Sequence, residues 1–374
     1  MKICIVGGIY APGGARRNFL KITPETTLET GLREAGHRVT TLSHYDHCDF
    51  SAYDVVHVHH LSYGAIRLAS DPSNTPFLFT AHDTSRMNGH AQGRVQSIGM
   101  RFVLSRADGV VALSTREADY LAENYSLRGA RQAVIPNGVD PSLYSFRRLN
   151  SAGQGKPWQV LFTGQLIPLK GVDLLLKAIA QLPANIELSL VYQSAPLEND
   201  LKALARELGV ADRVHFLGKL DPQALAHRYQ SSDLLVLPSS TEALPSVITE
   251  AMLCGLPFVA TAAGGIPEQA AGFGQLLTQR TPDALAAAMR HVFENYESFA
   301  AQGELMNLSA RERFSVSNMI ERHIALYSGM VHSAVSARRH AARFAPMNLV
   351  ARLAVRRHTL DNEQLQSSEA VTRP

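Results

Sequence analysis

Residues 234–260 read LLVLPSSTEALPSVITEAMLCGLPFVA, and this stretch decides the fold. Positions 234–238 form an apolar run of strand length, and a second such run begins at Phe258. Between them we expect a helix that starts at Pro245, because proline suits a first helical position. It should end before Gly255, because glycine suits the left-handed residue past a helix end. The order strand, loop, helix, strand predicts a unit of a parallel sheet.

The same alternation continues in both directions along the chain. The expected strands are 2–6, 38–42, 54–58, 77–81, 109–113, 133–135, 158–163, 186–192, 214–217, 234–237, 258–261 and 275–277, and the expected helices include 27–35, 171–182, 198–209, 222–231, 245–254 and 283–300. A loop rich in serine, glycine and glutamine at 150–156 interrupts the alternation and is typical of a linker. The pattern predicts an α/β protein with two doubly wound, Rossmann-like domains that face each other across a cleft.

This organisation divides the 374 residues into three parts. We expect a first domain at 1–150, a second at 151–325, and a basic C-terminal tail at 326–374 that could include a crossover helix. Each domain is long enough to bury its own core. A hydrophobic content of 45% and a charged content of 18% indicate a soluble globular enzyme. The three cysteines lack a metal-like spacing, so we expect buried thiols.

Two acids flank the predicted helix. Ligands of parallel sheets bind beyond the carboxyl ends of the strands. Glu242 lies in a loop at this edge of the predicted sheet, and Glu250 lies one to two turns into the predicted helix. The two carboxylates are too far apart to share a proton or a metal ion, but they can hold the two ends of an elongated ligand. The helix N-terminus between them suits a phosphate. Sugar hydroxyls, a diphosphate and ribose hydroxyls would fit in that order, which points to a nucleotide-sugar.

The pair of glutamates separated by seven residues, the run EAMLCGLPFVA at 250–260 and the turn GGIPE at 264–268 resemble the donor site of family 4 retaining glycosyltransferases of GT-B fold. The similarity extends over residues 1–325 by the order of the patterns. It implies transfer of a sugar, with retention and without a metal ion, from a nucleotide-diphosphate sugar to an acceptor hydroxyl. No cofactor is implied beyond the nucleotide-sugar, which is a co-substrate. An acceptor in glycan or envelope polysaccharide synthesis, free or lipid-linked, is what the family suggests.

The resemblance assigns roles to residues of both domains. Lys170, in the loop TGQLIPLKG at 163–171, would offset charge on the leaving diphosphate, and Glu242 would hold sugar hydroxyls. His82, at the end of the run FLFTA, would position the sugar or shape the acceptor pocket. The implied catalytic residues are therefore Lys170, Glu242 and His82, and the implied donor-binding residues are Gly13, Gly14, Gly164, Gln165, Ala243, Leu244, Pro245, Val247 and Glu250. The family commonly has arginine where this chain has Gln165, so stabilisation would rest more on Lys170 and the helix amides.

Several alternatives stay open at this point. A nucleotide-sugar-binding protein without catalysis is compatible with the missing arginine, and an epimerase or hydrolase of the same fold would need further acid and base groups. An NAD oxidoreductase is disfavoured, because the glycines of the first turn do not match GxGxxG. His57, His59 and His60 could suggest a metal, but no acid or cysteine at zinc spacing accompanies them, so we expect no metal site.

The tail combines positive charge with apolar residues. Residues 331–374 contain seven arginines against three acids. Such a segment either lies on an anionic membrane surface or is a solvated tail, and nucleic-acid binding is disfavoured because stacking aromatics are nearly absent. No apolar run approaches the length of a membrane span, and the start MKICIVGG is typical of a first strand. We therefore expect a cytoplasmic protein, free or peripheral on the inner face of the membrane.

Overall fold

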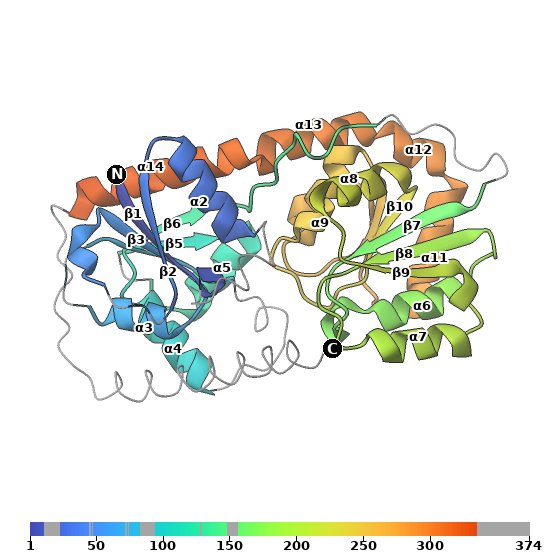
Figure 1. Cartoon of the computed structure of the whole chain (residues 1–374), viewed down its shortest axis with the longest axis horizontal. Helices are drawn as coiled ribbons and strands as arrows, with labels where there is room; N and C mark the ends of the chain where they lie inside the picture. Colours follow the sequence, from blue (N-terminus) through green and yellow to red (C-terminus); the bar gives the residue numbers. More distant parts are fainter. Residues whose placement is uncertain are drawn as a thin grey trace. The chain divides into compact units, whose positions relative to one another are not determined.

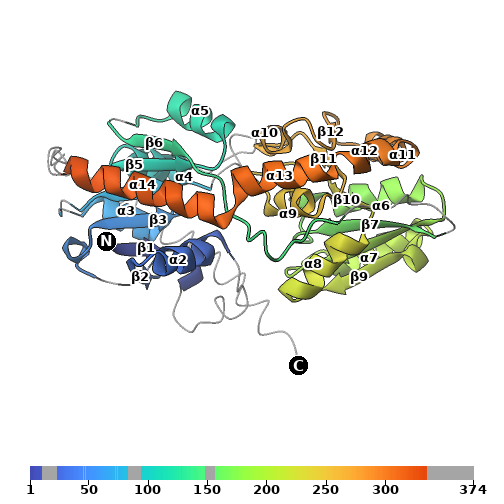
Figure 2. The same cartoon turned by 90° about the horizontal axis from the view of Figure 1, so that it is seen from above.

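The structure, a computed structural model, describes residues 1–10, 23–44, 46, 48–71, 73, 75–82, 94–127, 129–147 and 156–334. It divides into two compact units. Unit 1 consists of Met1–Pro136 and the chain from Met319 onward, and unit 2 consists of Asn137–Asn318. Each unit contains a six-stranded parallel sheet with helices on its faces (Figure 1, Figure 2). The predicted α/β class with two doubly wound sheets is confirmed.

Unit 1 is built around the strand order β2-β1-β3-β4-β5-β6. Its strands are β1 (Lys2–Val6), β2 (Arg38–Leu42), β3 (Val55–His59), β4 (Phe77–Thr80), β5 (Gly109–Ala112) and β6 (Arg131–Val134). Its helical elements are η1 (Gly8–Tyr10), α2 (Pro24–Glu34), η2 (Phe50–Ala52), α3 (Tyr63–Ala69), α4 (Arg94–Leu104), α5 (Thr115–Asn124) and most of α14 (Val316–Ala334). The strand order changes direction between β1 and β3.

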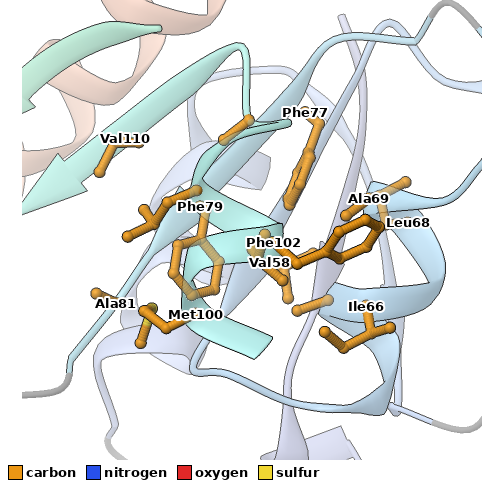
Figure 3. Packing of buried hydrophobic residues seen from close by; sticks show 14 of the residues in the cluster. Val58, Ile66, Leu68, Ala69, Phe77, Phe79, Ala81, Met100, Phe102 and Val110 are labelled. Carbon is orange, nitrogen blue, oxygen red and sulfur yellow. The ribbon is translucent and has the colours of Figure 1, made fainter. Parts of the chain in front are cut away.

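One part of the core of unit 1 lies between this sheet and helices α3 and α4. Phe77 and Phe79 of β4 alternate with residues of the opposite face, and they pack with Ile66 and Met100 of the two helices (Figure 3). Strands buried on both faces read as nearly continuous apolar runs, which explains why the sequence located them within one or two residues. The parallel register places the ends of β3 and β4 side by side.

Unit 2 has the strand order β12-β11-β10-β7-β8-β9. Its strands are β7 (Trp158–Thr163), β8 (Ile186–Val191), β9 (Val214–Gly218), β10 (Leu234–Leu237), β11 (Phe258–Thr261) and β12 (Gln275–Leu277). Its helical elements are η3 (Pro168–Lys170), α6 (Val172–Ala180), α7 (Glu198–Glu207), η4 (Ala211–Arg213), α8 (Pro222–Ser231), α9 (Ser246–Cys254), α10 (Ile266–Ala270), α11 (Pro282–Glu294), α12 (Tyr296–Ala301) and α13 (Gly303–Phe314). Here the order changes direction between β7 and β10.

Helix ends follow the chemistry of their first and last residues, with two departures from expectation. Gly255 ends α9 with φ 71°, as predicted. Pro245, however, is the residue before α9 and not its first helical residue, because its ψ of 124° is extended. The single helix expected at 283–300 is interrupted at Asn295, whose side-chain amide donates to the carbonyl of His291 and so competes with the helical pattern.

The two units do not divide at the predicted linker. The predicted limit at residue 150 falls within unit 2, which begins at Asn137. Val139 explains this early start: it pairs with Ser315, and its N–H donates to the carbonyl of Phe314 at 2.8 Å. Helix α14 begins in unit 2 and continues into unit 1, where Ile320 contacts Gly31 of α2. Residues 148–155 of the linker region and 335–374 of the tail lie outside the described residues.

Within the described ranges, no helix is both long and apolar enough to pass through a membrane. Cys4 and Cys254 are buried, as expected for structural thiols, and Cys48 is partly exposed.

Candidate functional site

Lys170 and Glu242 meet at the carboxyl edge of the sheet in unit 2. Lys170 follows β7 and Glu242 follows β10, and these two strands are parallel neighbours on either side of the point where the strand order changes direction. Ligands of open α/β sheets bind at this point. The Nζ atom of Lys170 lies 2.6 Å from Oε1 of Glu242, and the side chains are 22% and 9% exposed. The sequence indicated the two residues separately but not that they form an ion pair.

Backbone contacts hold the two loops together. The N–H of Ser240 donates to the carbonyl of Leu169 at 2.8 Å. Arg280 bonds to both loops, because its Nε donates to the carbonyl of Pro238 at 2.7 Å and its Nη2 to that of Pro168 at 3.3 Å. Sequence analysis missed Arg280, since a single arginine after a short strand carries no distinctive pattern. The contacts of Arg280 therefore hold the loop of Lys170 in place beside the loop of Glu242.

Gly171 allows this close approach. Its φ is +67°, and a Cβ atom at this position would lie 2.5 Å from Nη2 of Arg280 and 2.6 Å from the carbonyl oxygen of Pro238. Only glycine avoids both the backbone strain and the overlap. A glycine directly after Lys170 is therefore required for the loop to approach Pro238 so closely.

The N-terminus of α9 lies in the loop that carries Glu242. No side chain of the described residues caps this helix end, and the N–H of Ile248 is the first to bond within it, to the carbonyl of Pro245 at 3.2 Å. The buried amide of Gln269 also donates to that carbonyl, at 2.9 Å, and to Oγ1 of Thr249 at 2.8 Å. Gln269 of α10 thus holds the first turn of α9 in place. Its leading N–H groups, near Leu244 to Val247, have the geometry that attracts anions at helix N-termini.

Glu250 lies in the second turn of α9, among hydroxyl groups. Burial raises the pKa of Glu250 overall, and the nearby hydroxyl groups of Tyr229, Ser246 and Tyr144 offset only part of this rise. Burial raises the pKa of both tyrosines, which therefore remain protonated donors at neutral pH. Their rings pack edge to face with centroids 5.6 Å apart. Glu250 as a whole residue is only partly buried.

The other predicted donor-binding residues either lie at the carboxyl edge of the sheet in unit 2 or lie outside the described residues. Gly164 directly follows β7, and its N–H donates to the carbonyl of Val191 at 3.1 Å. Gln165 is exposed, so this position carries a neutral, solvated side chain. The carbonyl of Ala243 accepts from the N–H of Gly265 at 3.0 Å, which links the Glu242 loop to the GGIPE turn. Gly13 and Gly14 lie outside the described residues.

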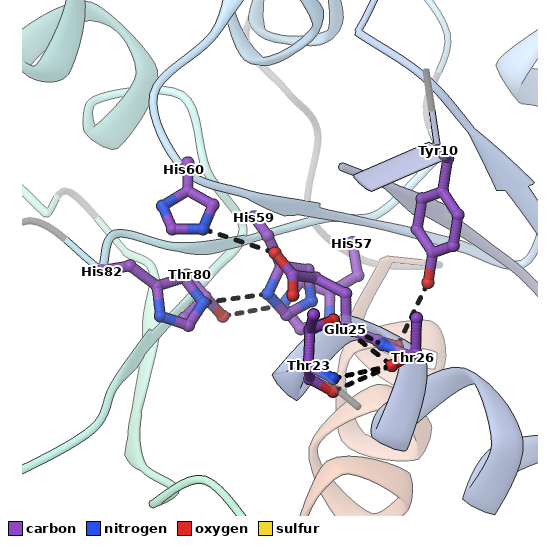
Figure 4. Close-up of polar contacts among 9 residues, drawn as sticks. All are labelled: Tyr10, Thr23, Glu25, Thr26, His57, His59, His60, Thr80 and His82. Carbon is purple, nitrogen blue, oxygen red and sulfur yellow. Dashed lines mark hydrogen bonds and ion pairs between the residues drawn. The ribbon is translucent and has the colours of Figure 1, made fainter. Parts of the chain in front are cut away.

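In unit 1, His82 is part of a histidine cluster at the ends of β3 and β4 (Figure 4). Its Nε2 lies 3.0 Å from Nδ1 of His59, and its ring stacks on that of His60 with centroids 4.4 Å apart. Nε2 of His60 lies 3.3 Å from Oε1 of Glu25, a buried residue in the first turn of α2. Sequence analysis singled out the histidines but missed Glu25, because the approach of α2 to β3 is a tertiary feature.

The deeper part of the cluster joins the sheet to helix α14. Nε2 of His57 lies 2.7 Å from Oγ1 of Thr80, and its Nδ1 lies 2.8 Å from the hydroxyl of Tyr327. Burial lowers the pKa of His59 to about 3 and that of His323 to about 4, and it lowers the pKa of His57 and His82 well below 6.5. These four imidazoles are therefore uncharged at neutral pH. Among the described residues, no three His, Cys, Asp or Glu side chains are arranged to hold a metal ion.

Comparisons with known proteins complete this description. The family model for glycosyl transferases group 1 matches residues 147–305, and that for glycosyltransferase family 4 matches residues 42–143. The chain is 32% identical over 320 residues to a D-inositol 3-phosphate glycosyltransferase of Geodermatophilus obscurus, which covers 77% of this chain and 69% of that protein. It is 30% identical over 315 residues to the protein of that name from Mycobacterium marinum, with 78% and 66% covered.

Two solved structures share the fold. Sucrose-phosphate synthase from Thermosynechococcus elongatus superposes with a TM-score of 0.76 at 20% identity, covering 89% of this chain and 100% of the other. HepE of Anabaena in complex with UDP and glucose gives a TM-score of 0.69 at 23% identity, covering 88% and 100%.

Proposed function

Because this chain belongs to the glycosyl transferases of group 1 and is a glycosyltransferase, we propose that it transfers a sugar from a nucleotide-diphosphate sugar to an acceptor hydroxyl with retention at the anomeric carbon and without a metal ion. The observation that carries the proposal is the Lys170–Glu242 pair at the strand-order change of unit 2. Its position beside the N-terminus of α9 supports a diphosphate site.

In this proposal, the two members of the ion pair have separate tasks. Lys170 and the leading amides of α9 stabilise the diphosphate as the bond from the anomeric carbon to its oxygen breaks. Glu242 accepts hydrogen bonds from the sugar hydroxyls. The acceptor oxygen bonds to the anomeric carbon from the same face, and its proton passes to the departing phosphate. No protein nucleophile is needed for this path.

Glu250 is the proposed partner of the ribose hydroxyls. The nearby hydroxyl groups of Tyr229, Ser246 and Tyr144 favour its ionised form, because they offset part of the rise in pKa that burial causes. An ionised carboxylate accepts from both ribose hydroxyls, whereas a protonated one does so less well. The two tyrosines therefore orient the group that holds the nucleoside.

The acceptor and the cellular setting are the less specific part of the proposal. A glycan or lipid-linked acceptor in envelope polysaccharide synthesis is one class, with the protein cytoplasmic or peripheral on the membrane. The name of the relatives from Geodermatophilus and Mycobacterium adds inositol 3-phosphate as a second acceptor to test.

The test is release of nucleotide from candidate donors, measured with and without acceptor. UDP-glucose is the first donor to try, since HepE is described in complex with it. A donor should raise the thermal unfolding temperature, because it binds only the folded state. We expect release that depends on acceptor. Release without acceptor would indicate a hydrolase, and binding without release in any combination would indicate a non-catalytic protein.

Retention and metal independence are tested on the product. The anomeric proton coupling of the product, compared with that of the donor, should show the same configuration. Turnover should persist in the presence of a chelator. Inverted configuration, or activity that is lost with chelator and restored by added Mg²⁺, would contradict these two parts of the proposal separately.

A further inference from the structure

Helix α10 and the glycine before it bind two carbonyl groups of the segment that leads into α9. The N–H of Gly265 donates to the carbonyl of Ala243 at 3.0 Å. The side-chain Nε2 of Gln269 donates to the carbonyl of Pro245 at 2.9 Å. A carbonyl oxygen only accepts hydrogen bonds, so the atom of Gln269 that faces Pro245 is the amide nitrogen. Both carbonyls are therefore directed toward donors of one short segment, residues 265–269.

The direction of each carbonyl fixes the direction of the N–H group that follows it. A trans peptide unit is planar, and its C=O and N–H point to opposite sides. The described residues contain no cis peptide bond. The bond to Pro245 thus turns the N–H of Ser246 away from α10, and the bond to Ala243 does the same for the N–H of Leu244. Neither of these two N–H groups donates a hydrogen bond within the described parts of the chain, and Ser246 is exposed.

Helix α10 is itself held firmly in unit 2. Its residues Ile266 and Ala270 are fully buried. Arg313 of α13 donates from Nη2 to the carbonyl of Glu268 at 2.6 Å, and from Nη1 to the carbonyl of Gln269 at 3.1 Å. These contacts fix the backbone from which the Gln269 side chain extends.

The amide of Gln269 is not the most stable side chain for its position. The residue is fully buried, and its Oε1 has no hydrogen-bond partner in the part of the chain that the structure describes. Buried polar atoms are rarely left without a partner, and an apolar side chain of the same size would avoid this cost. The carbonyl of Pro245 would still accept from the N–H of Ile248 at 3.2 Å. What only the amide supplies is the second bond, which directs this carbonyl toward α10.

We propose that Gln269 is a positioning residue that directs the N–H of Ser246 toward the diphosphate of the nucleotide-sugar. This role rests on the function inferred above and involves residues of unit 2 alone. Gln269 does not touch the ligand, because it acts through the peptide unit of Pro245 and Ser246. An N–H group that already has the right direction binds a phosphate oxygen more tightly than one that must first turn, since no reorganisation accompanies binding.

Gln269→Met tests this role, because methionine keeps the length of the side chain and cannot donate a hydrogen bond. The probes are UDP and uridine, or the corresponding nucleotide and nucleoside of whichever donor the turnover assay identifies, and isothermal titration calorimetry measures both affinities. We expect the affinity for UDP to fall about five-fold, as for loss of one oriented hydrogen bond. The affinity for uridine should stay unchanged, because uridine has no phosphate. The urea midpoint of the ligand-free variant should equal or exceed that of the wild type, because Oε1 is removed.

Thr249→Val is the matched control. It removes Oγ1, which accepts the other hydrogen bond of the Gln269 amide at 2.8 Å, and it leaves the bond to Pro245 in place. We expect the affinity for UDP to change by less than about two-fold. An effect as large as that of Gln269→Met would indicate general loosening of the start of α9 and would overturn the proposal.

The remaining outcomes separate this role from the proposed function. An unchanged affinity for UDP in Gln269→Met, or an equal loss for UDP and uridine, would overturn the positioning role. A variant that is less stable than the wild type, or that does not fold, would also overturn it, since Gln269 would then be a structural residue. A folded wild-type protein that binds no nucleotide and no nucleotide-sugar would instead refute the proposed function.

Discussion

The Nζ atom of Lys170 lies 2.6 Å from Oε1 of Glu242, although 72 positions separate the two residues in the chain. Each charge thus has a partner of opposite sign, and both side chains are mostly buried. Removing one member leaves the other as a poorly solvated charge, which is more destabilising than loss of the attraction alone. This pair therefore links the stability of unit 2 to the chemistry proposed for it.

Glu242→Gln keeps the shape of the side chain and removes its charge. We expect turnover to fall by about 100-fold or more, as for loss of a group that stabilises a transition state, and the free energy of unfolding to fall by about 2 kcal/mol. Steady-state kinetics and urea unfolding measure the two effects. Glu198→Gln is the control, because its pair with Lys202 has the same 2.6 Å distance but is more exposed and should contribute less than about 1 kcal/mol. Equal losses of turnover and of unfolding free energy in the two variants would contradict a catalytic and stabilising role of the Lys170–Glu242 pair.

Gly171→Ala should destabilise unit 2 strongly. The added Cβ would overlap the carbonyl oxygen of Pro238 and the guanidinium of Arg280, in addition to backbone strain at φ +67°. We expect a loss of about 3 kcal/mol in urea unfolding, with weaker donor binding because Lys170 is displaced. Gly209→Ala has nearly the same φ, +68°, and open space around its Cβ, so it should cost only about 1 kcal/mol. A similar cost for both variants would show that the overlap is relieved without consequence.

Arg280→Met should weaken donor binding more than it weakens the fold. Loss of its bonds to Pro168 and Pro238 frees the loops of Lys170 and Glu242 relative to each other. We expect KM for the donor to rise about ten-fold, since donor contacts are lost in the ground state and the transition state alike. Arg213→Met is matched to it, because Arg213 also donates to backbone carbonyls, those of Ile179 and Pro183, at the opposite end of the sheet. An equal rise in KM for Arg213→Met would show that Arg280 has no specific role in positioning the loops for donor binding.

The histidine cluster predicts acid sensitivity of unit 1. Burial lowers the pKa of His57, His59, His82 and His323, so the unfolded chain binds more protons than the folded one below pH 6.5. Stability from these groups is therefore complete above pH 6.5 and is lost as the pH falls, down to a pH of about 4 for His323 and about 3 for His59. Each residue contributes a slope of about 1.4 kcal/mol per pH unit at most.

Urea unfolding across this pH range measures the slope. His323→Phe should reduce it by about one proton, whereas His227→Phe, at an exposed position of α8, should not change it. Glu25 acts in the same direction at lower pH: burial raises the pKa of Glu25, but the hydrogen bond from His60 and the neighbouring imidazoles outweigh this and lower it overall. A flat profile between pH 6.5 and pH 4 would show that the imidazoles take up protons without unfolding.

Much of the fold could be read from local patterns. The runs at Leu234–Leu237 and Phe258–Thr261 are buried on both faces, so their composition alone marks them as strands. Proline after Asp221 and Thr281 marked helix starts, because both residues accept bonds from the first-turn amides. The break at Asn295 was missed, since helix propensity there differs little from that of its neighbours and the side-chain bond to His291 is visible only in the folded chain.

The candidate site could be predicted only in part, for a related reason. Glu242, Glu250, Lys170 and His82 lie at strand ends or helix starts, where spacing and residue type carry information. Glu25, Arg280, Tyr144 and Tyr229 lie in stretches whose local pattern is ordinary. Each acts through a partner far away in the chain, so no window of sequence contains both members of the contact.

The amino-acid sequence by itself determined the α/β alternation, the two sheets and the polar residues at their edges, because burial and chain direction act over a few neighbouring positions. Only the tertiary structure decided which of those residues meet. The parallel register puts Lys170 beside Glu242, and the approach of α2 and α14 to the sheet surrounds the histidines with Glu25 and Tyr327. These contacts depend on how distant segments pack, and the balance of opposite charges follows from that packing.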